Sequence, residues 1–321
     1  MKGLTDIPGI LVGHASDYEA LTGCSVVLCD GAVAGADIRG SASGTSEFEV
    51  MNPLHITPQI HAVVLAGGSA FGLEAASGVR RFLEQKGVGF ETGAARVPLV
   101  PAMILYDLGI GKAGVRPTRE MGEAAAAAAT NAPVEEGCVC AGTGATVGKI
   151  LGMKQAMKGG VGSATVTLEG YPGVMVAALA AVNALGDVRD PATGKLVAGA
   201  RVSASSRELA DSEKAFKAGR RGGFKGANTT LVVVATNARL PKTGAQKLAQ
   251  FGQLGVARAV SPAHTMSDGD AVIALSLGSA TSDINALGVA ASEAVGLAIV
   301  RGVRQARGLG GVPGLKDQGA W

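Results

Sequence analysis

The chain has 321 residues, of which 47% are hydrophobic and 17% charged, so it can bury a large core and is too apolar for a disordered protein. Its net charge is only +3, and no aromatic side chains interleave with the basic residues around Arg220, Arg221 and Lys225, which argues against nucleic-acid binding. The longest apolar run, residues 174–182, is far shorter than the roughly 18 residues of a membrane span, and residues 1–13 show no signal-peptide pattern.

The predicted elements begin with two apolar runs, residues 24–29 and 32–39, which flank Asp30-Gly31 and predict a β-hairpin with a tight primed turn. Residues 61–66 form a predicted buried strand, followed by a helix over about residues 70–85 with Ser69 as its N-cap. The pattern then predicts a helix over residues 117–130, strands near residues 138–142, 162–168, 174–182, 230–236 and 271–277, and helices near 205–218, 242–258 and 283–307. Mixed strands and helices without a break in composition indicate one α+β domain.

Two glycine-rich segments are similar to known motifs without matching them. In residues 142–149 the first glycine is misplaced for a phosphate-binding loop, and Ile150 stands where Ser or Thr is required, so no nucleotide site is expected. These glycines suit a backbone that lines a substrate pocket, with Lys149 placing a charge in it. In residues 67–72, Phe71 occupies the second glycine position of a nucleophile elbow.

Cysteine and histidine spacing does not indicate a metal or cofactor site. The cysteines lack C-x-x-C spacing and are expected to be buried, reduced thiols of a cytoplasmic protein; they are Cys24, Cys29, Cys138 and Cys140. The histidines lack spacing such as H-x-x-x-H and are interpreted as hydrogen-bonded structural residues; they are His14, His55, His61 and His264.

Several polar residues interrupt apolar segments. Asn183 lies inside the run 174–185, where an amide must find hydrogen-bond partners or face a cavity. Asp268 and Asp270 precede the strand 271–277; on one face of an extended segment they could hold an ammonium group or orient a nucleophile, and the alternative is a polar turn. Tyr106 on its own would be a core or edge aromatic.

Residues 226–237, Gly-Ala-Asn-Thr-Thr-Leu-Val-Val-Val-Ala-Thr-Asn, place an Asn-Thr bond at the start of an apolar strand. If the bond after Asn228 breaks, Thr229 gains an α-amine with a pKa of roughly 7.7–8.0, which can accept the proton of its own hydroxyl. The preceding loop, residues 217–227, is rich in glycine and basic residues, so its backbone can adopt the conformations that self-cleavage needs. The alternative is a simple turn into a buried strand.

The chain resembles the self-processing family of L-aminopeptidase/D-esterases, β-peptidyl aminopeptidases and nylon-oligomer hydrolases. The resemblance extends over nearly the whole length, in the family's order, through residues 6–14, 31–40, 67–72, 106–107, 142–149, 182–183, 228–230 and 268–270. It implies a single domain with a four-layer αββα sandwich, cut into a large chain, 1–228, and a small chain, 229–321. It also implies a homo-oligomer, a tetramer, that acts on small peptides or amides, and no cofactor is expected.

By the same resemblance, each site residue receives a role. The cut falls between Asn228 and Thr229, Thr229 is the nucleophile, and Tyr106 and Asn183 lie at the oxyanion. Lys149, Asp268 and Asp270 match positions associated with processing and with orienting the nucleophile. Aminopeptidase members often carry Ser and Glu at the two aspartate positions and Ser as nucleophile, so this chain leans toward the Thr-type branch.

Three functions follow from these residues. The first is an N-terminal-nucleophile amide hydrolase that works through an acyl-Thr229 intermediate. The second keeps the nucleophile but passes the acyl group to an amine, as the self-cleaving ornithine acetyltransferases do. The third is a non-enzymatic, glycine-rich ligand-binding protein in which the Asn-Thr-Thr sequence is only structural.

Overall fold

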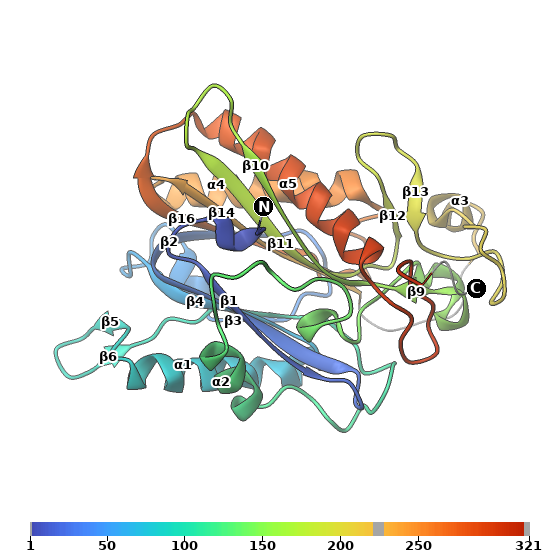
Figure 1. The fold of residues 1–321 in the computed structure, drawn as a ribbon, viewed down its shortest axis with the longest axis horizontal. Helices are drawn as coiled ribbons and strands as arrows, with labels where there is room; N and C mark the ends of the chain where they lie inside the picture. Colours follow the sequence, from blue (N-terminus) through green and yellow to red (C-terminus); the bar gives the residue numbers. More distant parts are fainter. Residues whose placement is uncertain (1, 221–227, 318–321) are drawn as a thin grey trace.

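Two β-sheet halves face each other at the centre of the fold, and helices cover their outer faces (Figure 1). The computed structural model describes residues 2–220 and 228–317. Its central strands follow the hydrogen-bonded order β10 (Gly160–Thr167), β11 (Met175–Asn183), β14 (Thr229–Ala238), β16 (Ala271–Ala280), β2 (Thr22–Ile38), β4 (Ile60–Ala66), β7 (Ala102–Ile104) and β3 (Thr45–Ser46), with β1 (Leu11–Asp17) paired to β2.

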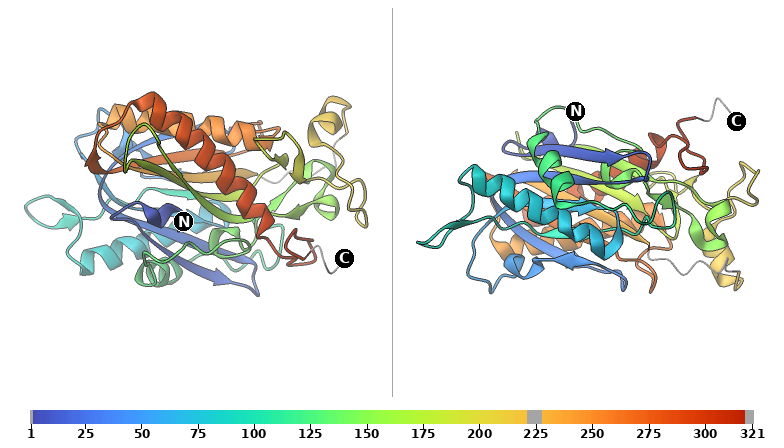
Figure 2. Two further views of the ribbon diagram at one scale, coloured as in Figure 1. Left: turned by 45° about the horizontal axis from the view of Figure 1, so that its top comes forward. Right: turned by 90° about the horizontal axis from the view of Figure 1, so that it is seen from below.

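Helices α4 (Lys242–Ala259) and α5 (Ile284–Arg304) lie together on one outer face, and α1 (Ala75–Gln85) and α2 (Arg119–Ala127) lie on the opposite one (Figure 2). Shorter elements are α3 (Ser212–Lys217), the pairs β5 (Phe90–Glu91) with β6 (Arg96–Val97) and β8 (Thr146–Val147) with β9 (Met157–Lys158), and the three-stranded sheet of β12 (Asp187–Arg189), β13 (Leu196–Ala198) and β15 (Val260–Ser261). The 3-10 helices are η1 (Leu4–Asp6), η2 (Phe48–Met51), η3 (Ser69–Glu74), η4 (Cys140–Gly142), η5 (Lys149–Leu151) and η6 (Met153–Gln155).

Alternation of side chains along the strands produces three separate cores. Along β14, Val232 and Val234 pack in the core shared with α4 and α5, whereas Leu231 and Val233 pack between the two sheet halves. On β4 the side chains of residues 63 and 65 join that middle core, and those of residues 62, 64 and 66 pack under α1 and α2. Helix, sheet, sheet and helix therefore form four layers, which confirms the predicted αββα sandwich.

The long strand β2 corrects the predicted hairpin. Its first half, residues 22–28, pairs with β1 and β4, and its second half, residues 33–38, pairs with β16. The pairing with β4 shifts register between Leu28 and Ala32, where Gly31 has a φ of 82°. Asp30-Gly31 is thus an irregularity inside one strand, because each apolar run finds its partners in a different half of the sheet.

Two helix predictions and one strand prediction also change. Ser69 does not cap the helix after β4: the N-cap is Gly68, with φ 79°, and the chain runs through η3 before α1 begins. Residues 138–142, predicted as a strand, contain η4, since Gly142 and Thr143 donate backbone hydrogen bonds to Val139 and Cys140. The helix predicted over 205–218 shortens to α3, which begins after Asp211, whose side chain accepts from the N–H of Lys214.

The four cysteines are free and buried, as predicted. Helix α5 is long and apolar enough to cross a membrane by composition, with a mean hydropathy of 1.6, but 72% of that window is buried inside the fold. Packing against β10, β11 and α4 therefore accounts for its apolar composition.

Candidate active site

Three strands bring the predicted site residues to one edge of the sheet. Antiparallel pairing of β11 with β14 places the last residue of β11, Asn183, opposite the first residue of β14, Thr229. Parallel pairing of β14 with β16 places the segment before β16 beside Asn228, which forms a bridge with Asp268. Residues far apart in sequence thus meet because the end of β11 and the segment before β16 both lie beside the start of β14.

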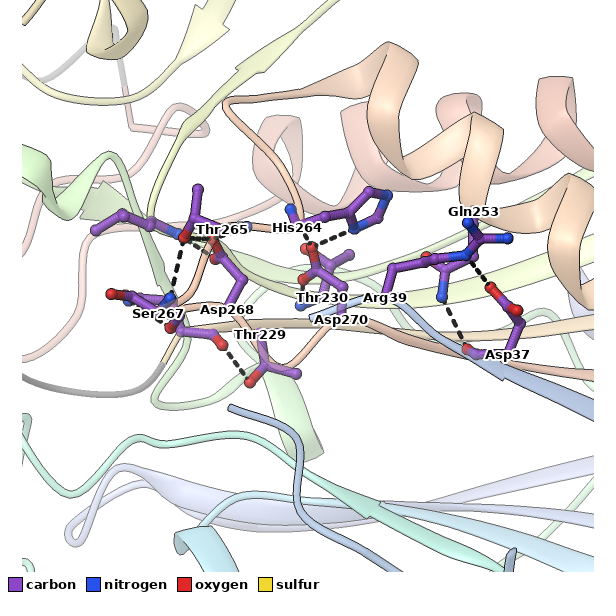
Figure 3. Close-up of polar contacts among 12 residues, drawn as sticks. Asp37, Arg39, Thr229, Thr230, Gln253, His264, Thr265, Ser267, Asp268 and Asp270 are labelled. Atoms are coloured by element: carbon purple, nitrogen blue, oxygen red, sulfur yellow. Dashed lines mark hydrogen bonds and ion pairs between the residues drawn. The ribbon is translucent and has the colours of Figure 1, made fainter. Parts of the chain in front are cut away.

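The Asn228 carbonyl oxygen accepts two hydrogen bonds across the predicted cleavage point. The Thr229 hydroxyl donates to it over 2.5 Å, and the backbone N–H of Gly269 donates over 2.6 Å. Figure 3 shows the Thr229 hydroxyl turned toward this oxygen, next to the loop that carries Asp268. Thr229 is only 1% exposed, so its hydroxyl is fixed within the fold beside the preceding peptide bond.

Gly269 was not anticipated from the sequence, although it stands between the two predicted aspartates. A Cβ at this position would lie 2.9 Å from Thr229 Oγ1 and 2.6 Å from the carbonyl oxygen of Ala42. Such distances are well inside normal contact, so only glycine allows the backbone to approach the nucleophile this closely.

Asp268 and Asp270 bind different partners instead of sharing one group. Asp268 accepts from the N–H of Leu185 at 3.2 Å and from both the N–H and the hydroxyl of Thr265. Burial raises the pKa of Asp268; the negative charge of Asp270 raises it further, and Lys149 lowers it.

Asp270 links the loop to β14. Its Oδ1 accepts the N–H of Thr230 at 2.6 Å, and its Oδ2 accepts from the N–H and Nδ1 of His264 at 3.0 and 2.9 Å, taking Nδ1 as protonated (Figure 3). Each aspartate therefore holds a different segment around Thr229.

Lys149 contacts Asn183, the cross-strand partner of Thr229. It is 2% exposed, and its Nζ donates to both the backbone oxygen and Oδ1 of Asn183, each at 2.8 Å. Burial lowers the pKa of Lys149 to about 7; Lys158 contributes to the lowering, and the charges of Asp268 and Asp270 oppose it. A substantial share of the amine is therefore neutral near pH 7.

The amide of Asn183 finds the partners that its apolar surroundings require. Its Oδ1 accepts from the N–H of Thr146 at 3.0 Å as well as from Lys149, and its Nδ2 donates to the backbone oxygen of Tyr106 at 2.9 Å. These bonds fix which way the amide faces. They use one of the two Nδ2 hydrogens and leave the other, within the described part of the chain, for a ligand.

Tyr106 lies beside these residues on a narrow cleft. Lys149, Thr146, Ile110 and Met153 are among the other lining residues, and the cleft volume is only about 10 Å³. That is about the space that one water needs.

The histidines were predicted to be hydrogen bonded. This prediction is confirmed for three of them: His55 bonds to the Thr57 hydroxyl, His61 to the backbone N–H of Leu99, and His264 to the Asp270 carboxylate. The prediction is wrong for His14, whose buried ring nitrogens have no hydrogen-bond partner within residues 2–220 and 228–317.

The loop over residues 217–227 was predicted to allow self-cleavage. Its residues 221–227 lie outside the described part of the chain.

The fold is that of the N-terminal-nucleophile hydrolases. It is similar to an L-aminopeptidase D-Ala-esterase/amidase from Ochrobactrum anthropi, a variant of that fold, with a TM-score of 0.73 and 18% identity over 97% of this chain and 88% of the other. A β-aminopeptidase from Burkholderia sp. gives a TM-score of 0.70 and 22% identity over 98% and 90% of the two chains. At these identities the likeness concerns the fold.

The chain belongs to Peptidase family S58, whose profile matches residues 2–316. It is 38% identical to an uncharacterised aminopeptidase of Mycobacterium leprae, over 98% of this chain and 93% of the relative. It is 29% identical to a 6-aminohexanoate-oligomer endohydrolase of Kocuria sp., over 93% and 85% of the two chains. At the level of the family, the predicted hydrolase of peptide or amide bonds is confirmed.

Proposed function

We propose that the chain cuts itself between Asn228 and Thr229 and that the freed Thr229 is the nucleophile of an amide hydrolase. The products are a large chain, 1–228, and a small chain, 229–321. The main support is the pair of hydrogen bonds from Thr229 Oγ1 and Gly269 N–H to the Asn228 carbonyl oxygen, at 2.5 and 2.6 Å.

Self-cleavage begins with attack of Thr229 Oγ1 on the carbonyl carbon of Asn228. Negative charge develops on the Asn228 oxygen, where the Gly269 N–H is already aimed, so the oxyanion forms with a donor in place. The C–N bond then breaks, the Thr229 nitrogen takes up a proton, and an ester joins Asn228 to the Thr229 hydroxyl. Water hydrolyses this ester, giving a carboxylate on Asn228 and a free amine and hydroxyl on Thr229.

This first step needs a base other than the Thr229 nitrogen, which is an amide in the uncut chain. We assign the base to Lys149, because a neutral amine has two N–H donors for its two bonds to Asn183 and one lone pair left for a proton. Asn183 is the cross-strand partner of Thr229, so Lys149 lies beside the nucleophile.

Turnover uses the new amine of Thr229. With a pKa of roughly 7.7–8.0 this amine accepts the hydroxyl proton as Oγ1 attacks a substrate carbonyl, and later returns it to the leaving amine. The unused Nδ2 hydrogen of Asn183 donates to the substrate oxyanion, a contribution worth roughly 10²–10³ in rate per donor. Tyr106, whose backbone oxygen accepts from Asn183, completes the oxyanion side in this proposal. Water then releases the acyl group.

The substrates we propose are small peptides or amide oligomers with an accessible amide bond. Support comes from the relatives, whose names include aminopeptidases and 6-aminohexanoate-oligomer endohydrolases. We further propose a cytoplasmic protein, which four free, buried thiols fit, and a homotetramer by resemblance to the family.

A substrate panel on the cut protein tests this proposal. The panel holds dipeptides with a free N-terminus, the same dipeptides acetylated, a β-peptide, a D-amino acid amide and a 6-aminohexanoate oligomer. We expect hydrolysis of at least one class, with water as the main acceptor when hydroxylamine or an amino acid is added. A cut protein that hydrolyses none of them, or one that passes most acyl groups to the added amine, would contradict the hydrolase assignment.

The rate of self-cleavage should depend on pH through Lys149. Burial lowers the pKa of Lys149 to about 7, so the neutral base grows as pH rises through that value. We expect cutting to accelerate from about pH 6 to about pH 8 and to level off above it. The measurement is a time course of cutting after cell-free synthesis and a jump to each pH.

Lys149→Met and Lys149→Arg are the control variants. Both should stay uncut at every pH, since neither supplies a neutral amine. A flat pH profile, or rapid cutting by Lys149→Arg, would rule out Lys149 as the base.

A further inference from the structure

A second buried lysine, Lys158, lies outside the chemistry described above. It is fully buried on β9, and its Nζ donates to the backbone oxygens of Thr143 and Ala145 at 2.8 and 2.7 Å. Burial lowers the pKa of Lys158 to about 8, and the nearby Asp107 acts in the opposite direction. Burying a charge of this kind costs folding free energy unless the charged group is hydrogen bonded or paired, and such bonds can fix one arrangement of the surrounding backbone.

Asp107 lies against the same loop from another side. It is 4% exposed, and it accepts from the Thr22 hydroxyl and the Gly68 N–H, each at 2.7 Å. A Cβ on Gly144 would lie 2.6 Å from the Cβ of Asp107, so the carboxylate residue touches the loop between the two carbonyls that Lys158 holds. Burial raises the pKa of Asp107, and the positive charge of Lys158 lowers it.

Both residues lead directly to Asn183. The loop that Lys158 holds continues into Thr146, whose N–H donates to Asn183 Oδ1 at 3.0 Å. Asp107 follows Tyr106, whose carbonyl oxygen accepts from Asn183 Nδ2 at 2.9 Å. The two buried charges therefore fix the two backbone groups that set the orientation of the Asn183 amide.

We propose that Asp107 and Lys158 are positioning residues for turnover, which act by holding the Asn183 amide toward the substrate oxyanion. This inference rests on the proposed function, because it takes Asn183 as an oxyanion donor. Self-cleavage places its oxyanion on the Gly269 N–H instead, and Lys149 keeps its bond to the backbone oxygen of Asn183 whichever way the amide faces, so the pair acts on substrate hydrolysis more than on cutting.

The test compares Asp107→Asn and Lys158→Met with Asp187→Asn in the cut protein. Asp187 is a matched control: it is a fully buried carboxylate whose hydrogen bonds within the described residues come from Ala200 and Ser212 and not from Asn183. We expect Asp107→Asn and Lys158→Met to cut themselves and to lose roughly 10–100-fold in kcat with little change in KM, because a small displacement of a donor has effects of that size. Asp187→Asn should keep kcat within about threefold, whatever it loses in Tm.

Each variant is also made in an Asn183→Ala background. Residues that act only through Asn183 should have no further effect there, so the loss in kcat from Asp107→Asn should shrink to less than about twofold. Asp107→Asn keeps the size of the side chain and decides the matter if Lys158→Met does not fold.

Three results would overturn the assignment: kcat values equal to that of Asp187→Asn, full losses that persist in the Asn183→Ala background, or folded variants that remain uncut. An Asn183→Ala protein with normal kcat would instead remove the oxyanion role of Asn183, which separates a failure of the proposed function from a failure of this inference.

Discussion

The Thr229→Ala protein is expected to stay a single chain of 31.8 kDa with no amide-hydrolase activity. The substitution removes the hydroxyl that donates to the Asn228 oxygen, and with it both the attacking atom of self-cleavage and the nucleophile of turnover. Denaturing electrophoresis reads the first loss, and amide hydrolysis by the purified protein reads the second. Thr229→Ser keeps a hydroxyl at the same place and should still cut.

Thr230→Ala is the matched control for this experiment. Thr230 is also fully buried on β14, but its side chain points to the opposite face of the strand. Its hydroxyl has no hydrogen-bond partner among the residues that the structure describes. The Thr230→Ala protein should therefore cut normally. Cutting or amide hydrolysis by Thr229→Ala would show that another residue is the nucleophile.

Gly269→Ala is expected to slow self-cleavage by roughly 10²–10³, the usual effect of losing one oxyanion donor. The added Cβ would lie 2.9 Å from Thr229 Oγ1 and 2.6 Å from the oxygen of Ala42, so either the hydroxyl or the Gly269 backbone must move. Movement of that backbone takes its N–H away from the Asn228 oxygen. The measurement is the half-time of cutting after cell-free synthesis.

Gly170→Ala provides the comparison for Gly269→Ala, since a Cβ at Gly170 meets no atom within 4 Å. It should cut at the normal rate. Thermal unfolding of both proteins shows whether Gly269→Ala is folded. A folded Gly269→Ala protein that cuts as fast as Gly170→Ala would remove the Gly269 N–H from the mechanism.

Much of the fold follows from apolar periodicity. The runs 174–182 and 271–277 become β11 and β16, and the helix predicted over 242–258 is α4, because long, regular patterns commit a segment to one element. The hairpin over residues 24–39 failed, since the sequence does not show that each half of β2 pairs in a different half of the sheet. A turn-like Asp30-Gly31 then forms an irregularity within a strand.

The candidate site was predictable where a polar residue interrupts an apolar run, as at Asn183, or where a motif matched a family, as at Thr229. Gly269 and Lys158 could not be predicted, because their contacts depend on strand register and loop packing between distant segments. Lys158 stands next to two glycines and reads as a surface residue, whereas the fold buries it under a loop of carbonyl oxygens.

Intact mass spectrometry of freshly purified, active protein tests the central claim most directly. Scaling the 31.8 kDa chain by residue count, we expect pieces of about 23 and 9 kDa, with the smaller one beginning at Thr229 and its amine free. Activity should rise in proportion to the cut fraction. A homogeneous, uncut polypeptide with full hydrolase activity would contradict the account.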